Sequence, residues 1–354
     1  MKAIWDRLKD LFGGEEGMPL HGKIALPLVA VGVALLSPGW KDAALAYLNK
    51  SYGLGLSLDA PWWAGAACVV LGVLVFLVGH LTSSRKPVGQ FVAIRHQSFQ
   101  PLTGPLPPDA LPRKMRGRKI VTYDCDQSNF LSLGAFDPIG AVRQQQRMIT
   151  EIAGILKADS SAALGYYGIV HIPLQLLAGC GVSSFPQVAL FDLHRETSTW
   201  RELQAGTGPD LAVKTARTID PPHPIACVIR VEVSYAVRSD DVAEVVAGPY
   251  RDYSISIGKP GIDKVTHYGQ VDQISAAFRS ILDEIHGELP SNLVVHVFYS
   301  GPVGLGFTLG RRISRTIHNP VVVYNYTANT KPAYAWSVEV TKEGRPEDMV
   351  AVYK

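Results

Sequence analysis

The sequence predicts two N-terminal transmembrane helices followed by an α/β domain built from two similar halves. Three observations lead to this prediction. Two hydrophobic runs without a charged residue lie within the first 82 residues. From residue 119 onward, apolar strand-like segments alternate with helical segments, which is typical of a largely parallel sheet covered by helices. In the same region, one order of histidine, proline and tryptophan positions occurs twice.

Composition excludes several classes of protein. A chain of 354 residues exceeds one ordinary domain, and its 47% hydrophobic content is high for a soluble protein. The net charge of +3 does not indicate a nucleic-acid binder, so no DNA or RNA duplex is expected as a partner. The four cysteines are scattered without a CxxC pair, which favours free thiols over a metal site.

The clearer membrane segment is residues 61–82. It holds about the 20 apolar residues that a bilayer crossing requires, with two tryptophans at its start and a basic pair after it. An earlier run within residues 18–40 is also free of charge after Lys23, although it contains Pro27. A cleaved signal peptide is the competing interpretation of that run, and acidic residues before it argue against this.

The spans define the topology of the N-terminal part. Residues 41–60 form a short periplasmic loop that is poor in Lys and Arg, whereas basic residues precede the first span and follow the second. The positive-inside bias therefore places both termini in the cytoplasm. Residues 1–17 are expected to form an amphipathic helix on the inner membrane surface.

Three glycines in the second span recur every seven residues, at Gly65, Gly72 and Gly79. They would lie close to one face of the helix and permit close contact with another helix. The alternative is that glycine is simply common in membrane helices.

Residues 83–118 are expected to be a connector. A strand-like stretch at 90–99 comes first, followed by five prolines in residues 101–112, which favour extended structure. A basic cluster at 113–119 could face anionic lipid or attract an anionic ligand, or it could be a solvated loop.

The soluble domain divides into a first half at 119–220 and a second half at 221–354. The first half contains the expected strands KIVTYDCD, YYGIVHIPL and QVALFDLH and an expected helix at 138–157. The second contains the strands CVIRVEVSYAV, YSISIG, LVVHVFYS and PVVVYNYT and a helix at 271–286. Repetition of one such unit predicts a pseudo-dimer.

The repeat rests on paired positions in the two halves. The matched pairs are His171 with His296, Pro173 with Pro302, Pro186 with Pro320, and Trp200 with Trp336. Both histidines lie in segments expected to be apolar strands, so we interpret them as hydrogen-bonded core residues. In open α/β sheets the ligand crevice lies at the carboxyl ends of the strands, and a twofold pair would join two crevices into one broad site.

The candidate ligand-binding residues are those expected at strand ends and in the small-residue turn after LVVHVFYS. Backbone N–H groups of such a turn can approach phosphates, and aromatic rings can stack on bases. The set comprises Asp126, Gln127, Ser128, Asn129, Pro173, Gln175, Tyr299, Ser300, Gly301, Pro302, Gly304, Tyr324 and Tyr326. Taken alone, the last two tyrosines fit a core or edge position equally well.

No catalytic motif emerges from the sequence. The glycines of GPVGLGFTLG do not have the GxGxxG spacing, and no P-loop, HExxH or GxSxG is present. Paired carboxylates occur only in polar settings that suit solvated side chains. We therefore expect neither a cofactor nor enzymatic activity.

The stretch HVFYSGPVGLGFTLGRRI, with the later NPVVVYNYT and YAWSVEV, resembles the C-terminal signature of SAVED domains over roughly residues 90–354. This resemblance implies a sensor of two fused CARF-like, Rossmann-like halves. It also implies a cyclic di-, tri- or tetranucleotide ligand, with a trinucleotide expected, made by a cGAS/DncV-like nucleotidyltransferase in bacterial anti-phage (CBASS) signalling. With the two spans, the chain resembles the membrane class of SAVED effectors in the bacterial inner membrane.

Three functions remain open at this stage. The first is a ligand-gated effector that assembles into a homo-oligomer and disrupts the lipid bilayer by a pore or a general lesion, leading to abortive infection. The second is a membrane-tethered enzyme that degrades a cyclic oligonucleotide. The third is a membrane receptor that signals to a separate partner.

Overall fold

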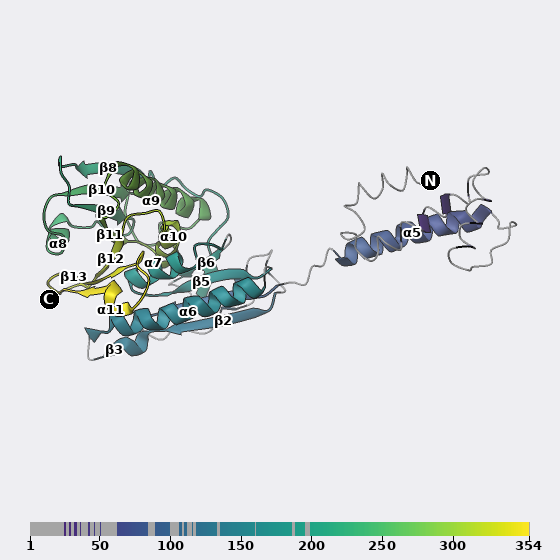
Figure 1. Cartoon of the computed structure of the whole chain (residues 1–354), viewed down its shortest axis with the longest axis horizontal. Coiled ribbons are helices and arrows are strands. Elements are labelled where there is room, and N and C mark those ends of the chain that lie inside the picture. The colour runs from purple at the N-terminus through teal and green to yellow at the C-terminus, as the bar shows by residue number, and fades with distance from the viewer. Residues whose placement is uncertain are drawn as a thin grey trace. The chain divides into compact units, whose positions relative to one another are not determined.

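The computed structural model describes residues 62–83, 89–99, 118–132, 135–159, 161–185, 188–194 and 199–353, with isolated positions between 25 and 50 and between 106 and 115. The expected interfacial helix at 1–17 lies outside the described residues, as do most of the expected first span and its loop. The chain divides into two compact units, Met1–Val88 and Gly89–Lys354, which are considered separately (Figure 1).

The main helix of the first unit is α5, Trp62–Ser83, which coincides with the segment predicted as the second span. It contains no charged residue, and several of its apolar side chains are exposed, including Val70, Leu74 and Leu77. Across the part of the chain that is described, no helix combines the length and apolarity that crossing a membrane requires.

Glycines bring α5 close to the preceding helical residues. A Cβ added at Gly72 would lie 2.7 Å from Val29 Cγ2, and one added at Gly32 would lie 2.6 Å from the carbonyl oxygen of Gly65. Gly79 follows two turns later in the same helix. Two members of the heptad glycine series therefore lie where the helical backbones approach each other.

The second unit contains two main sheets. The first has the order β2-β1-β5-β6-β7, in which the first four strands are parallel and β7 is antiparallel to β6. Its strands are β1 Phe91–Gln97, β2 Ile120–Asp126, β5 Ala163–Ile169, β6 Val188–His194 and β7 Thr199–Glu202. A small hairpin of β3 (Leu131–Ser132) and β4 (Ala135–Phe136) follows the short helix η3, Ser128–Phe130.

The second sheet repeats this order and adds a strand at each edge, giving β14-β13-β12-β11-β9-β10-β8. Its strands are β8 Lys214–Ile219, β9 Ala226–Glu232, β10 Tyr250–Ser256, β11 Val294–Ser300, β12 Val321–Tyr326, β13 Tyr334–Glu339 and β14 Val350–Val352. The helices of the second unit are α6 Pro138–Ala158, α7 Ile172–Gly181, α8 Ser239–Ala243, α9 Tyr268–Glu288, α10 Val303–Arg312 and α11 Pro346–Met349.

The two halves correspond strand for strand, which confirms the predicted duplication. Strands β2, β1, β5, β6 and β7 match β10, β9, β11, β12 and β13 in order and direction. Helices α6 and α9 have 21 residues each, and α7 and α10 have 10 residues each. Each half is thus one α/β unit with its strand order reversing beside its first strand.

The residue pairing predicted for the repeat is wrong in part. His171 is the N-cap of α7, and its structural counterpart is Pro302, the N-cap of α10. His296 is the third residue of β11, where β5 has Gly165. The expected strand YYGIVHIPL ends at Ile169, before the histidine. Proline lies in the first turn of α7 but at the N-cap of α10. Aligning the two prolines therefore shifted the predicted pairing of the halves.

Strand β1 lies between β2 and β5, within the range expected to be a connector. Two leucines of the Pro-rich stretch that follows also pack on the protein. Leu106 and Leu111 are 3% exposed and join a cluster with Tyr167 and Trp200 on one face of the first sheet. The backbone N–H of Leu106 donates to the Tyr167 hydroxyl at 3.2 Å. These residues belong to the first half.

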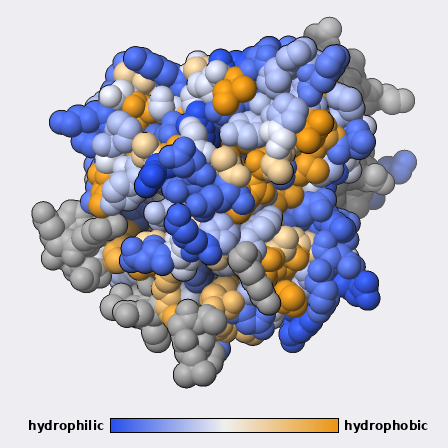
Figure 2. All heavy atoms as spheres, turned by 90° about the vertical axis from the view of Figure 1, so that its left-hand side faces the viewer, coloured by the Kyte–Doolittle hydropathy of each residue, from blue (hydrophilic) through white to orange (hydrophobic). Residues whose placement is uncertain are grey.

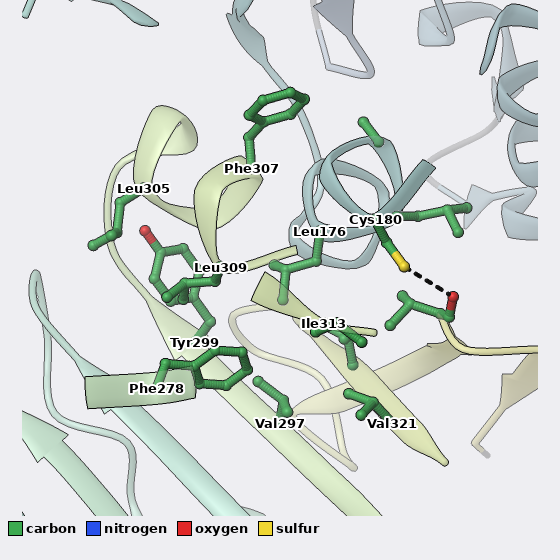
Figure 3. Packing of buried hydrophobic residues seen from close by; sticks show 14 of the residues in the cluster. Leu176, Cys180, Phe278, Val297, Tyr299, Leu305, Phe307, Leu309, Ile313 and Val321 are labelled. Carbon is green, nitrogen blue, oxygen red and sulfur yellow. Dashed lines mark hydrogen bonds between the residues drawn. The ribbon is translucent and has the colours of Figure 1, made fainter. Parts of the chain in front are cut away.

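Helices α7 and α10 cross with their backbones in contact, and this crossing joins the halves (Figure 3). A Cβ added at Gly179 would overlap the carbonyl oxygen of Phe307, and one added at Gly310 would overlap the carbonyl oxygen of Leu176. Buried residues of both halves, including those drawn around the crossing, form one continuous hydrophobic core. The crossing fixes how the two sheets face each other.

Candidate functional site

The parallel strands of both sheets end on the same side of the second unit. Helix α8, which follows β9, and the β3–β4 hairpin, which follows β2, lie on one side in Figure 1. That side faces the viewer in Figure 2, where apolar groups lie among hydrophilic ones. Ligands of open α/β sheets bind at this edge, beside the strand where the order reverses.

Four aromatic rings lie at the carboxyl edge of the first half, and we term them the aromatic cluster. Phe99 follows β1, His171 follows β5, and Phe136 ends β4, while Trp336 comes from β13 of the second half. The His171 ring lies 4.1 Å from Phe99 and 4.2 Å from Phe136, between centroids. Trp336 lies 5.6 Å from Phe136 and 5.7 Å from His171. The second half thus completes the edge of the first.

Local hydrogen bonds orient the histidine of this cluster. The backbone N–H of His171 donates to Ser98 Oγ at 2.8 Å, and the same hydroxyl lies 2.6 Å from His171 Nδ1. We assign the Ser98 hydroxyl as the donor to Nδ1, which leaves the proton of the neutral ring on Nε2. Burial lowers the pKa of His171 to about 4, so the ring is neutral near pH 7. Phe99 remains 44% exposed and can stack on a ligand.

The second half has a different side-chain set at the equivalent edge. The loop after β9 is fixed by Ser300, whose carbonyl oxygen accepts from the N–H groups of Val233 and Ser234. Its hydroxyl oxygen accepts from the N–H of Tyr235 at 3.0 Å. The Tyr235 ring is 60% exposed, so it offers a stacking surface near the turn that precedes α10.

Asp192, near the end of β6, lies beside that turn, and the charge of the exposed Asp263, after β10, acts on it; we term these two carboxylates the acidic recess. A Cβ added at Gly304, in the first turn of α10, would lie 3.9 Å from Asp192 Oδ1. Burial, reinforced by the charge of Asp263, raises the pKa of Asp192 to about 6. Here a residue of the first half completes the edge of the second.

Most predicted residues after β2 serve the fold. Gln127 is fully buried; its Oε1 lies 2.9 Å from His96 Nε2 and its Nε2 donates to the Ala141 carbonyl oxygen. Asp126 accepts from the N–H and the hydroxyl of Ser128, which lower its pKa. Asn129 is exposed on the same edge. Of this group, Asn129 has the most accessible side chain.

The predicted helix-start residues are buried between the halves. Pro173 is buried, and Gln175 is 2% exposed, packed against the Cα of Gly306 with no hydrogen-bond partner for Oε1 in the described structure. Tyr299 is also buried and donates its hydroxyl to the Pro302 carbonyl oxygen at 2.6 Å. These side chains support the turn without facing solvent.

The remaining predicted residues divide between turn, core and edge. Ser300, Gly301 and Pro302 are partly exposed at the end of β11. Tyr324 is a core residue, 1% exposed, whose hydroxyl lies 2.8 Å from His296 Nδ1. Tyr326 is 50% exposed at the end of β12 and packs edge-on against a neighbouring tyrosine.

Six residues of this edge escaped the sequence prediction: Phe99, Phe136, Asp192, Tyr235, Asp263 and Trp336. The usable signal for Phe99 was its position directly after a strand-like stretch. Trp336 and Asp192 gave no such signal, because each completes the edge of the half to which it does not belong.

Comparison with known proteins identifies the sensor domain. Residues 145–340 match the family model "SAVED: SMODS-associated and fused to various effectors sensor domain", which is more than half of the chain. No curated protein matches.

Two solved receptor structures are similar to this chain. A Cap4 SAVED/CARF-domain containing receptor of Acinetobacter baumannii, with the cyclic trinucleotide 2'3'3'-cAAA, has 12% identity and a TM-score of 0.49 over 82% of this chain and 64% of that chain. The Cap4 receptor of Moraxella osloensis has 10% identity and a TM-score of 0.45 over 82% of this chain and 63% of that chain. This chain thus spans less than two thirds of either receptor. On the strength of the family match, the chain belongs to the SAVED family of sensor domains.

Proposed function

We propose that this protein is a cyclic-oligonucleotide sensor that acts as an effector at the bacterial inner membrane. A nucleotidyltransferase of the cGAS/DncV type supplies the ligand in anti-phage signalling. Ligand binding to the second unit favours homo-oligomer formation, and the N-terminal helices then disrupt the bilayer. The protein itself performs no catalysis in this proposal.

One observation carries the sensor half of the proposal: the carboxyl edges of two matched α/β units lie on one side and complete each other. Each edge has an exposed aromatic ring, Phe99 in one and Tyr235 in the other. Two stacking surfaces on one face suit a ring that presents several bases, and every base offers a π-face. A cyclic trinucleotide is the ligand that we would test first.

The membrane half of the proposal rests on the sequence and on α5. Residues 60–84 contain no charged side chain, and apolar side chains of α5 are exposed. We propose that residues 18–40 and 61–82 span the bilayer with both termini in the cytoplasm. For ligand binding to act as a switch, the ligand must bind one assembly state more tightly than the other.

Thermal unfolding of the full chain in detergent tests the sensor proposal. Cyclic di-, tri- and tetranucleotides are added separately, with linear trinucleotides as controls. A ligand at about a hundred times its Kd should stabilise the protein by about 2.7 kcal/mol. Absence of any shift with every cyclic ligand contradicts the proposal. Assaying the same samples for ligand cleavage distinguishes a sensor from a degrading enzyme.

Dye release from phosphatidylethanolamine–phosphatidylglycerol vesicles tests the membrane proposal. We expect the bound ligand to trigger release by the full chain alone, and Gly72→Leu to reduce it because Leu cannot fit against Val29. Ala67→Leu, at an exposed position of α5, is the matched control. Binding without release would favour a receptor that signals to a separate partner.

A further inference from the structure

Asp192 is a carboxylate at the candidate site for which the described part of the chain provides no bonding partner. Among the described residues, no hydrogen bond or ion pair reaches its oxygen atoms, although Arg201 lies directly across the β6–β7 pair. Its side chain is partly accessible from the carboxyl edge. An unpaired carboxylate in a recess costs stability, so its presence there calls for a physical explanation.

Two tyrosine hydroxyls near Asp192 donate to other acceptors. The hydroxyl of Tyr268 donates to Glu202 at 3.0 Å, and that of Tyr299 donates to the Pro302 carbonyl oxygen. Asp263 adds a second negative charge. Each nearby hydroxyl has thus committed its only proton elsewhere.

The equivalent position in the other half lacks this property. Asn325, near the end of β12, is 3% exposed, and its side-chain nitrogen lies 3.3 Å from Thr327 Oγ1. The duplicated fold therefore does not require a free acceptor at this point. Asp192 is specific to the edge that contains Tyr235 and the turn before α10.

Charge determines which part of a cyclic oligonucleotide fits the acidic recess. Two carboxylates repel a phosphate, so the phosphates lie elsewhere and a part of the ligand that donates hydrogen bonds, a base edge or a ribose hydroxyl, faces Asp192. A carboxylate accepts hydrogen bonds only, and two adjacent donors satisfy both of its oxygens. Among the four common bases, guanine presents such a pair, N1–H and N2–H, on its Watson–Crick edge.

We propose that Asp192 selects a guanine base of the cyclic ligand by accepting hydrogen bonds from N1–H and N2–H. The base stacks on the exposed aromatic ring of that edge, while the aromatic cluster takes another base without reading its edge. This inference rests on the proposed sensor function and adds the base preference of one of its two edges.

A divalent cation held by the two carboxylates is the main alternative occupant. Mg²⁺ is often bound through one or two carboxylates and a phosphate. The described residues contain no group of three or more His, Cys, Asp or Glu side chains placed to hold a metal ion. Two carboxylates joined by a phosphate of the ligand fall below that number, so the experiment includes a chelator that separates a bound cation from a bound base.

The test uses the full chain in detergent, with thermal unfolding against three cyclic trinucleotides: all-adenine, all-guanine, and one guanine with two adenines. Asp192→Asn is nearly isosteric but replaces one acceptor with a donor. Asp240→Asn, on exposed α8, is the matched control. We expect the guanine-containing rings to bind Asp192→Asn about tenfold more weakly than wild type, which corresponds to about 1.4 kcal/mol. All-adenine binding should not weaken.

The outcomes distinguish failure of the guanine inference from failure of the sensor proposal. If guanine-containing rings bind wild type and Asp192→Asn equally, or if EDTA removes the guanine preference, the inference is wrong while the sensor proposal stands. If only all-adenine rings bind, the inference is wrong as well. If no cyclic oligonucleotide stabilises the wild type, the sensor proposal fails and takes the inference with it.

Discussion

The aromatic cluster and the acidic recess occupy equivalent edges of the two halves, yet their chemistry differs. The first contains a neutral histidine between phenylalanine rings, with Trp336 arriving from the other half. The second contains Asp192 and Asp263, with Asp192 arriving from the other half. Both edges keep an exposed aromatic ring. Each edge therefore receives one residue from the other half, but the two residues received differ.

The comparison of the two edges shows that different residues determine the symmetry of the backbone and the chemistry of the site. The helix crossing admits only glycine at Gly179 and Gly310, so the two halves must meet in one arrangement. Side chains at the carboxyl edges do not carry that constraint. One half can therefore provide apolar stacking while the other provides hydrogen-bond acceptors.

The largest expected effect comes from breaking the symmetric crossing. Gly310→Ala should lower the free energy of unfolding by about 3 kcal/mol, because its Cβ would overlap the Leu176 carbonyl oxygen and the helices must separate. Gly179→Ala should cost a similar amount, since its Cβ would overlap Phe307 in the same way. Urea unfolding of each variant measures both values.

Gly154→Ala in α6 provides the control for the crossing. A Cβ there meets nothing within 4 Å, so alanine should stabilise the helix by about 0.5–1 kcal/mol. If Gly310→Ala were as harmless as Gly154→Ala, the crossing would not hold the halves together. Unequal losses in the free energy of unfolding at Gly179 and Gly310 would show that the two helix–helix contacts of the crossing tolerate a Cβ differently.

Sequence patterns predicted the elements of the second unit well, because its strands are short apolar runs and its long helices begin at clear signals. Helix α6 begins at Pro138, as expected, and Asp137 caps it by accepting from the N–H groups of Ile139 and Gly140. Strand β1 was also expected at its observed place, but its membership in the sheet was not. A sequence pattern does not reveal which strands pair with each other. Strand β1 pairs with strands that begin at Ile120 and Ala163, further along the chain.

The candidate site was less predictable for a related reason. Strand ends can be found from sequence, but the direction of a side chain depends on the register of the strand. Gln127 and Tyr324 follow or lie in the expected strands, yet both point into the core. Trp336 lies more than 160 residues after His171 in the chain, and only the helix crossing brings their rings together.

The second largest effect concerns pH at the aromatic cluster. The pKa of His171 is lowered to about 4 by burial, against 6.5 for an unperturbed histidine. An unfolded chain therefore binds an extra proton between these values, so stability is present above pH 6.5 and is lost as pH falls toward 4. We expect His171→Leu to reduce the acid-induced loss of stability by about 2 kcal/mol, measured by urea unfolding at pH 7 and pH 4.5.

Two other histidines also contribute to the loss of stability in acid. The pKa values of His96 and His296 are likewise lowered to about 4 by burial, so part of the acid sensitivity must survive in His171→Leu. An unchanged dependence on pH would mean that the His171 ring is solvated, and the aromatic cluster would then be open.

The stacking rings provide a smaller effect that compares the two edges directly. Phe99→Ala and Tyr235→Ala should each weaken binding of the cyclic ligand about tenfold, because a stacked base contributes on the order of 1–3 kcal/mol. Tyr235 is 60% exposed, so Tyr235→Ala should change stability without ligand by less than about 0.5 kcal/mol. Phe99→Ala also removes the packing against His171 and should cost about 1 kcal/mol. Isothermal titration of each variant measures the affinity. Loss from one variant alone would show that a single edge binds the ligand.

The smallest expected effect is a change in the stability of the ligand-free protein when Asp192 of the acidic recess is replaced. The raised pKa of Asp192, about 6 against 3.8, means that the folded protein holds its proton more tightly than the unfolded chain. The stabilising contribution is therefore complete below pH 3.8 and disappears as pH rises through 6. Asp192→Asn should leave stability at pH 4 nearly unchanged and raise it at pH 8 by about 1 kcal/mol, after allowance for solvent screening.

Scanning calorimetry at pH 4 and pH 8 measures this difference as a rise in Tm of about 2 °C at the higher pH alone. Asp240→Asn, which changes a carboxylate that is 91% exposed, should give no rise at either pH. A loss of stability in Asp192→Asn at pH 8 would mean that the carboxylate already has a donor in the free protein. Neither edge would then contain a hydrogen-bond acceptor that lacks a donor in the free protein, and the two edges would differ only in their side chains.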